Sequence, residues 1–479
     1  MTYQDYLEDG QRDVKTFVAT AIKRHLSSSD YKTAVSADNY DRQMNDTIYN
    51  YVRTIFTSTG AEVQDFTAAN NRIASNFFHR LNTQRVMYSL GNGVSFSQHK
   101  ETRRGADGIE ITVDVTKDTL GDDFDTALRS VAYDALIHGV AFGYWDYDRL
   151  YVFPLTEFVP LWDEETGALR AGIRFWQLDP QKPMTAVFYE EDGFTKFRGK
   201  RHGGIMDFDE IQPKTGYKQR VMVSEADGAQ VVGFENYGVL PIVPMWGSRL
   251  KQSTLIGMQR SIDSYDLIRS GFANDLTDCA QIYWILSNCG GMTEPELARF
   301  RDRLKVQHIA VADTDESGIT PYTQDIPFQA RQTYLEGIKA GIYEDFGGLD
   351  VHTIAAGATN DHIDAAYQPL DENADDFEYQ IIQFVRQVLA LIGIDDTPVF
   401  KRNRISNQTE QVNMVMMESQ YLDDETILQK LPNISVDEVP TILARRTLNN
   451  AARFTLDELD NDSDNGEQGD SGQNSPEMA

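Results

Sequence analysis

Apolar residues recur every three or four positions from Leu255 to Cys279, a spacing that places them on one face of an α-helix. That face comprises Leu255, Met258, Ile262, Tyr265, Ile268, Phe272, Leu276 and Cys279. The other side carries Asp263, Asp266, Arg269, Asn274, Asp275 and Asp278. Ser253 and Thr254 are suitable N-cap residues. The pattern predicts a helix with one packed side and one solvated side.

Downstream, the pattern predicts a second helix from about Phe328 to Gly347 and a third from about Glu372 to Ile392. The second ends at a glycine pair and is expected to pack beside the first helix. Its apolar stripe is Phe328, Leu335, Ile338, Ile342 and Phe346. Apolar residues of the third helix spread too widely for one face, so this helix requires partners on several sides.

Between the first two helices lies an insert of about 45 residues, too small to be stable without neighbours. Thr293 and Glu296 form a capping-box pair that predicts a short helix. Strands are expected at Ile282–Leu286, Val306–Val311 and Ile319–Gln324.

The first 250 residues indicate an α+β region. Residues 1 to about 90 are predicted to be helical, with a firmer helix from Ala68 to about Leu90. A helix from Asp122 to His138 follows. From Val140 to Met245, turn signals alternate with runs rich in Val, Phe, Tyr and Trp, which predicts a β-meander.

Composition adds limits rather than an activity. The chain has 479 residues, 41% of them hydrophobic, which suffices for a substantial core. Its two cysteines, Cys279 and Cys289, fit neither a CxxC metal site nor a disulfide framework, so a reducing cytoplasm is expected. The sequence lacks an apolar run long enough for a membrane span and a typical signal peptide, so we expect a soluble chain without membrane contact.

The net charge of −30 argues against a protein that grips nucleic acid, because such binding depends on neutralising phosphates. It remains compatible with a surface that DNA slides past. Residues 456–479 are strongly acidic and are predicted to be a disordered tail.

One cluster of acids invites a catalytic interpretation. Asp371, Glu372, Asp375 and Asp376 have the spacing of a Mg²⁺ cluster for nuclease chemistry, but acids near a helix N-terminus also complement its dipole, and we favour that explanation. Phosphate-binding loops, serine-hydrolase elbows and HExxH motifs are absent from the sequence. We therefore expect no enzyme activity, metal or cofactor.

Basic residues are concentrated in short runs. Arg299, Arg301, Arg303 and Lys305 make the helix of the insert basic, which suits a docking surface or a solvated face equally well. The run from Lys401 to Arg404 is predicted to be an exposed loop.

A loop of about twenty residues precedes the third helix, long enough to suggest a function. Its small or polar residues are candidates for contact with DNA, against the alternative of a simple connector. They are Ala355, Ala356, Gly357, Ala358, Thr359, Asn360 and His362.

The order of these segments up to about residue 455 resembles the portal proteins of tailed bacteriophages, especially the long-tailed type that infects Gram-positive hosts. The residues that carry the resemblance are Arg80–Gly91, Val140–Tyr144, Tyr151–Pro160, Asn236–Pro244, Ile262–Asp266, and Asn274 with Asp275.

The resemblance implies a portal fold with an α/β wing, a two-helix stem, a small α/β clip, a long channel helix and a helical crown. The implied boundaries are 1–253 for the wing, 254–281 and 328–348 for the stem helices, 282–327 for the clip, 349–368 for the tunnel loop, 369–394 for the channel helix, 395–422 for the return to the wing, and 423–455 for the crown.

Such proteins form a ring, usually of twelve subunits, at one capsid vertex of the virion, after assembly in the host cytoplasm. The implied partners are double-stranded DNA in the bore, the terminase large subunit, a head-completion adaptor, and the major capsid and scaffolding proteins. The implied role is a non-enzymatic conduit for DNA packaging and ejection that also nucleates capsid assembly. The alternatives are a metal-dependent nucleic-acid hydrolase that uses the Asp371–Asp376 carboxylates, and another head–tail connector ring, although connectors resemble shorter chains.

Overall fold

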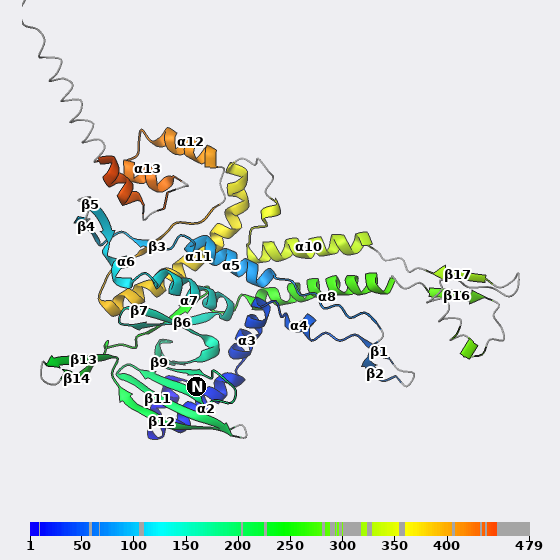
Figure 1. Ribbon diagram of the computed structural model, residues 1–479, viewed down its shortest axis with the longest axis horizontal. Helices are drawn as coiled ribbons and strands as arrows, with labels where there is room; N and C mark the ends of the chain where they lie inside the picture. Colours follow the sequence, from blue (N-terminus) through cyan, green and yellow to red (C-terminus); the bar gives the residue numbers. More distant parts are fainter. Residues whose placement is uncertain are drawn as a thin grey trace, which may run out of the picture. The chain divides into compact units, whose positions relative to one another are not determined.

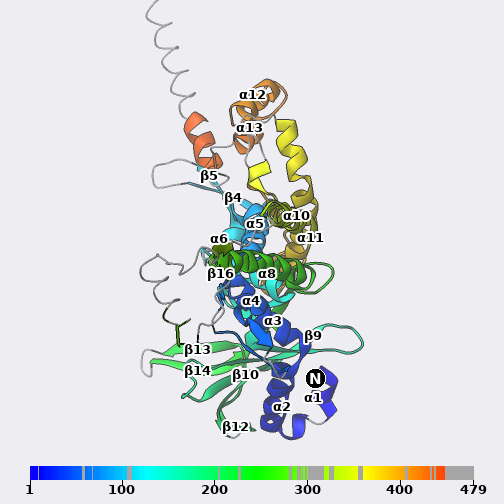
Figure 2. The same cartoon turned by 90° about the vertical axis from the view of Figure 1, so that its right-hand side faces the viewer.

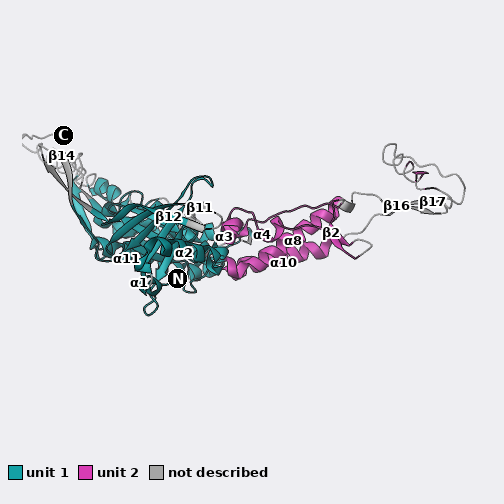
Figure 3. Ribbon diagram, turned by 90° about the horizontal axis from the view of Figure 1, so that it is seen from below, with its two compact units in different colours: residues 1–35, 82–254, 347–479 teal, residues 36–81, 255–346 magenta. Residues whose placement is uncertain are grey.

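The computed structural model separates into two compact units, one built from residues 1–35, 82–254 and 347–479 and the other from residues 36–81 and 255–346 (Figure 3). We call them the first and the second unit. The structure describes residues 1–8, 10–56, 60–66, 68–104, 110–202, 205–224, 228–279, 283–287, 293, 295–296, 299, 318–322, 328–353, 360–404, 408–431, 434–435 and 438–447. Helices and antiparallel sheets both occur among these residues, which confirms the α+β class.

A five-stranded antiparallel sheet in the first unit has the order β12-β11-β10-β9-β8. The strands are β8 (Phe158–Trp162), β9 (Leu169–Trp176), β10 (Met184–Glu190), β11 (Gly193–His202) and β12 (Ile205–Thr215). Helices α1 (Tyr3–Glu8) and α2 (Val14–Ser27) bury Tyr6, Phe17 and Val18 with apolar residues of the sheet in one core. The predicted β-meander is thus confirmed in this region.

A second core surrounds a three-stranded sheet of order β15-β6-β7. Its strands are β6 (Val140–Asp146), β7 (Arg149–Pro154) and β15 (Ile242–Trp246), and the helices that pack on it are α7 (Phe124–His138) and α11 (Asn360–Ile392). Phe377, Ile381 and Phe384 of α11 are buried with Trp145 and Leu128. The wide apolar surface of α11 therefore has the partners on several sides that its sequence pattern requires, and its own chain supplies most of them.

Smaller elements complete the first unit. They are β3 (Val94–Phe96) paired with β18 (Pro398–Phe400), β4 (Lys100–Arg104) with β5 (Glu110–Asp114), β13 (Lys218–Ser224) with β14 (Gly228–Glu235), α6 (Val115–Leu120), η1 (Gly10–Arg12), η2 (Leu155–Glu157) and η3 (Val351–Thr353). Helices α12 (Gln408–Glu418) and α13 (Asp424–Lys430) lie together in both views (Figures 1 and 2), and Lys430 Nζ lies 2.8 Å from Glu418 Oε2. Part of the segment predicted to return to the wing thus packs with the predicted crown.

The second unit is built on α8 (Leu255–Cys279) and α10 (Phe328–Phe346), which pack side by side as predicted (Figure 1). The rings of Phe272 and Phe328 lie 5.4 Å apart, and Arg331 pairs with Asp275. The unit also contains α4 (Asp46–Tyr49), β1 (Thr54–Phe56) paired with β2 (Glu62–Gln64), and β16 (Tyr283–Ser287) paired with β17 (Gly318–Tyr322). Two helices, α3 (Ser29–Asp41) and α5 (Phe77–Leu90), contribute residues to both units.

The predicted insert is confirmed where the structure describes it. β16 and β17 correspond to two of its three expected strands, while residues 306–311 lie outside the described residues. The backbone N–H of Thr293 donates to Glu296 Oε2 at 2.8 Å, which is the reciprocal half of the expected capping box.

The predicted solvated side of α8 is wrong in part, because Arg269 is exposed whereas Asp266 and Asn274 are buried. Residues 68–76, which we call the strap, run along it, and Asp266, Ser270 and Asn274 are at most 4% exposed. The backbone N–H groups of Asn71, Ile73 and Ser75 donate to Asn274 Oδ1 at 2.5 Å, Ser270 Oγ at 2.9 Å and Asp266 Oδ1 at 2.9 Å.

This ladder has a geometric basis. Two residues of an extended chain and four residues of a helix both advance by about 6 to 7 Å, so alternate strap amides meet every fourth residue of α8. Because backbone N–H groups need acceptors when buried, the polar side chains of α8 hold the strap in place of a sheet partner. For the same reason the helix predicted from Ala68 begins only at Phe77.

The start of α11 also differs from the prediction. Residues 360–368, expected in a loop, are helical, and Pro369 lies inside the helix. Ile363, Tyr367, Leu370 and Ala374 keep the helical spacing and are buried with Tyr88. This packing outweighs the hydrogen bond that Pro369 lacks.

Candidate functional site

Acidic residues on α11 face a pair of arginines from the loop after β18. Asp371, Asp375 and Glu378 follow one another at helical spacing, so their carboxylates lie on one face of α11. Arg402 and Arg404 belong to the basic run predicted to be an exposed loop. The run is a loop, but Arg402 is half-buried against the helix, with 24% of its side chain exposed.

Arg402 joins all three acids. Its Nε and Nη2 donate to the two oxygens of Glu378 at 3.0 and 2.9 Å, a bidentate arrangement. Its Nη1 donates to Asp371 Oδ1 at 2.9 Å, and its Nη2 also contacts Asp375. Planar guanidinium geometry suits this multiple pairing.

Arg404 extends the network toward the start of α11. Its Nη1 donates to Asp364 Oδ1 at 3.0 Å, and its Nη2 contacts Asp371. Tyr88 of α5 accepts from Arg404 Nε at 2.8 Å and donates to Asp371 Oδ1 at 2.6 Å. We call these residues, with Asp375, Glu378 and Arg402, the α11 ionic network.

Charges in the network shift the pKa values of its members. Partial burial raises the pKa of Asp371, but hydrogen bonds from Tyr88 and the two arginines outweigh burial and leave the pKa lowered. Glu378 and Asp375 hold the pKa of Arg402 above its usual value. Asp371 is therefore an ionised hydrogen-bond acceptor at neutral pH and is poorly suited to act as a general acid.

The remaining acids have separate partners. Asp376 Oδ2 accepts from the backbone N–H of Arg249 at 3.2 Å and interacts electrostatically with Arg85, whose burial lowers its pKa to about 10. Glu372 is exposed and accepts from Gln368 at 3.3 Å. The sequence alone favours the dipole at a helix N-terminus as the explanation of the four acids from Asp371 to Asp376. Because α11 begins at Asn360, none of the four lies in its first turn, so that explanation is wrong.

The arginines occupy carboxylate oxygens that a Mg²⁺ ion would need. Within the part of the chain that the structure describes, no set of three or more His, Cys, Asp or Glu side chains is arranged to hold a metal ion. Also among the described residues, no helix is long and apolar enough to cross a bilayer. The ion pairs of the α11 acids with Arg402 and Arg404 favour a structural role for these acids, that of holding α11 in position.

Comparison with known proteins identifies the family. A sequence model described as "Phage portal protein, SPP1 Gp6-like" matches residues 29–450. The chain belongs to this portal family. It is 24% identical over 439 residues to the portal protein of Clostridium phage phiCD119, an alignment that covers 84% of this chain and 92% of that protein. It is 22% identical over 441 residues to the portal protein of Bacillus phage SPP1, with 86% and 82% covered.

The resemblance to portal proteins of phages from Gram-positive hosts is thus confirmed. The family match includes residues from both units and stops before the acidic tail.

The predicted DNA-contacting residues fall mostly outside the described residues, which omit 354–359 and with them Ala355, Ala356, Gly357, Ala358 and Thr359. Asn360 is the first residue of α11 and His362 lies exposed in its first turn. In the predicted clip, Arg299 is exposed, while Arg301, Arg303 and Lys305 lie outside the described residues.

Sequence reasoning missed the network that joins α11 to the basic run. The spacing of Asp371, Asp375 and Glu378, followed by Arg402 and Arg404, was a usable signal for ion pairs. Tyr88 lies 283 residues before Asp371, and nothing in the sequence connects the two.

Proposed function

We propose that this portal protein assembles into a ring at one capsid vertex and forms the conduit through which DNA enters and leaves the phage head. The family match over residues 29–450 carries the proposal. The order of elements supports it, because α8 and α10 flank β16 and β17 in the chain and are followed by α11. A single type of subunit suffices to build a closed ring.

In this proposal each segment has one task. The wing and crown meet the major capsid and scaffolding proteins and nucleate assembly, and the clip, with Arg299, Arg301, Arg303 and Lys305, is the platform for the terminase large subunit and later for the head-completion adaptor. The tasks follow the boundaries that the resemblance implies, 1–253 and 395–422 for the wing, 254–281 and 328–348 for the stem, 282–327 for the clip and 423–455 for the crown. One boundary changes: because α11 begins at Asn360, the tunnel loop is taken as 349–359 and the channel helix as 360–394.

The charge of the chain suits a conduit. At −30 per subunit, the ring repels phosphates and lets DNA slide instead of binding it tightly. The small side chains of Ala355–Thr359 allow DNA to approach the backbone closely. Exposed Glu372 adds negative charge on α11, the helix that follows that loop in the chain.

The α11 ionic network is assigned a positioning role. Arg404 holds Asp364, in the second turn of α11, and Asp371, two turns further on. Tyr88 ties the same carboxylate to α5. The network thus fixes the turns of α11 that directly follow the proposed tunnel loop. The C-terminal end of the loop is therefore anchored to a fixed helix.

Immunogold electron microscopy of purified virions tests this function. An antibody against the chain is expected to label a single vertex, at the junction of head and tail. Label spread over the whole shell, or virions that lack the chain, would contradict the portal role.

A nuclease assay with Mg²⁺ separates the portal role from a hydrolase. Activity in the wild type that disappears in the Asp375→Asn/Asp376→Asn variant would favour the hydrolase. Our expectation is that neither protein cleaves DNA.

A further inference from the structure

The hairpin β1–β2 exposes apolar side chains on a structure too small to be stable alone. Each strand has three residues, all exposed, and Ile55 pairs with Val63. Phe56 is 73% exposed and Phe66, just after the hairpin, is 84% exposed. Isolated two-stranded hairpins are marginally stable in water, so this hairpin requires a partner surface.

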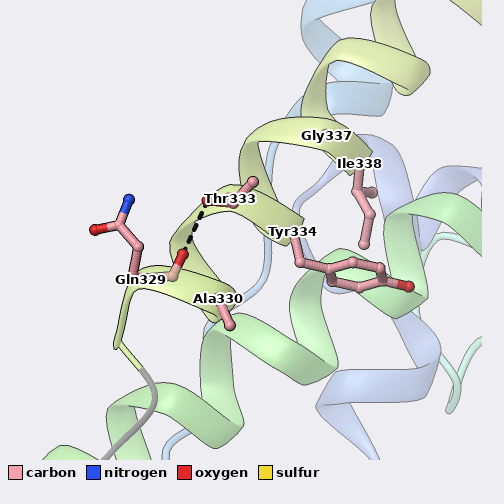
Figure 4. Close-up of a pocket in the computed structure, with 6 residues that line it drawn as sticks. All are labelled: Gln329, Ala330, Thr333, Tyr334, Gly337 and Ile338. Atoms are coloured by element: carbon pink, nitrogen blue, oxygen red, sulfur yellow. Dashed lines mark hydrogen bonds between the residues drawn. The ribbon is translucent and has the colours of Figure 1, made fainter.

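A matching surface lies on α10 of the same unit. A hollow of about 790 Å³ is lined by Gln329, Ala330, Thr333, Tyr334, Gly337 and Ile338 (Figure 4). All six side chains are uncharged, and the Thr333 hydroxyl donates to the Gln329 carbonyl at 2.9 Å. A Cβ added at Gly337 or Gly341 would have no atom within 4 Å, so another backbone has room to approach. We call this hollow the α10 groove.

The hairpin and helix α10 lie on opposite sides of α8 (Figure 1). The strap, which directly follows the hairpin, is held by Ser270 and Asn274, whereas α10 contacts α8 at Phe272. Phe272 is two residues from Ser270 and two from Asn274, and two residues rotate a helix by about 200°, so the strap and α10 contact opposite faces of α8. With its strap fixed on the far side of α8, the hairpin is kept away from its own groove.

We propose that the hairpin of one subunit docks in the α10 groove of the next copy of this chain. Two different surfaces on opposite sides of one unit form a head-to-tail contact, the kind that closes into a ring. Because each copy carries a net charge of −30, the uncharged lining of the α10 groove is a place where a second copy, whose hairpin carries the single acid Glu62, approaches with little repulsion. This inference rests on the proposed ring, and it identifies the hairpin and the α10 groove as the two surfaces of the subunit interface.

Two variants remove one half of the contact each. The hairpin variant carries Phe56→Asp and Phe66→Asp, and the groove variant carries Ala330→Glu and Gly337→Glu, all at exposed positions. The matched control, Leu178→Asp/Leu250→Asp, puts the same added charge on two leucines that are 86% and 70% exposed elsewhere. Native mass spectrometry of each full-length protein, and of a mixture of the two variants, measures the oligomers.

We expect rings from the wild type and the control, and a loss of rings by about tenfold or more from either variant alone, because each loses buried apolar contacts. In the mixture, the intact hairpin of the groove variant can enter the intact groove of the hairpin variant. One-to-one pairs that grow no further are therefore expected.

Each contrary outcome has a distinct meaning. A wild type that never forms rings overturns the proposed ring and the docking together. If the wild type forms rings and either variant alone also forms them, only the docking is overturned. The same holds if the wild type forms rings but the mixture of the two variants stays monomeric.

A second measurement does not depend on the folding of those variants. In a chain whose Cys279 and Cys289 are replaced by serine, Phe66→Cys and Tyr334→Cys together should give a ladder of disulfide-linked oligomers on mild oxidation. Either cysteine alone should not. A ladder absent from the double variant would overturn the docking.

Discussion

The substitution Ser270→Ala is the sharpest test of how the strap is held. Ser270 is 1% exposed, and its Oγ accepts the Ile73 N–H at 2.9 Å. Alanine removes this oxygen and leaves the apolar packing of α8 unchanged. It is also the best helix former, so the helix itself does not weaken.

The expected change in the free energy of local opening follows from the loss of one hydrogen-bond acceptor. A buried backbone N–H without its partner costs about 1–3 kcal/mol, and the better helix propensity of alanine returns about 0.5 kcal/mol. The net loss for local opening of the strap is about 0.5–2.5 kcal/mol, which speeds opening by about 2- to 70-fold.

Hydrogen exchange measured by mass spectrometry on peptides that cover residues 68–76 is the appropriate assay. A chain with two compact units need not unfold in one step, so local exchange reports more directly than a global transition. Ser264→Ala on the same helix is the control, because Ser264 is not among the residues that bond the strap. If both variants exchange within about twofold of the wild type, the ladder does not hold the strap.

Three further predictions concern the first unit and one helix of the second. Arg402→Met should lower the free energy of unfolding, measured in urea, by about 1–3 kcal/mol, because partly shielded ion pairs with Asp371 and Glu378 are lost. The pKa of Asp371 is lowered from 3.8, so its contribution is present above that value and is lost as pH falls through the folded-state pKa. The stability difference between the wild type and Asp371→Asn, followed by denaturation at several pH values, should therefore shrink below about pH 4. Gly347→Ala should lower the melting temperature by an amount equivalent to about 1–2 kcal/mol, because φ of Gly347 is +63° and a Cβ there would lie 1.9 Å from Asn373 Nδ2. By contrast, Gly271→Ala in α8 should stabilise the protein by up to about 1 kcal/mol, because alanine is the better helix former and a Cβ there meets no atom within 4 Å.

Each of these predictions has its own contrary result. Arg386→Met, which removes only an exposed arginine bonded to Thr397, is the control for Arg402→Met, and equal losses in the two would argue against the network. A pH-independent difference for Asp371→Asn would mean that its ionisation is not linked to folding. Equal effects at Gly347 and Gly271 would show that backbone conformation does not decide the outcome.

Local patterns in the sequence predicted the elements best. The spacing of apolar residues predicted α8, α10 and α7 and the strands from Val140 onward, because each depends on a period of 3.6 or 2 within one segment. The Gly347 stop was predicted for the same reason, since glycine readily adopts the positive φ that ends a helix.

Distant pairings explain the failures. Part of the polar side of α8 is buried by the strap, whose hydrogen bonds span 191 to 203 residues of sequence. Polar residues that accept from a backbone look the same in sequence as polar residues in water. The site was recognised only in part for the same reason. The acids of α11 stood out in the sequence, but their arginine and tyrosine partners came from elsewhere in the chain.

Native mass spectrometry of the purified chain, with negative-stain electron microscopy of the same sample, tests the central claim most directly. The portal account predicts one closed ring with a central hole and a mass that is a whole multiple of 54.2 kDa, with twelve copies giving about 650 kDa. A chain that stays monomeric or dimeric at every protein and salt concentration would contradict it.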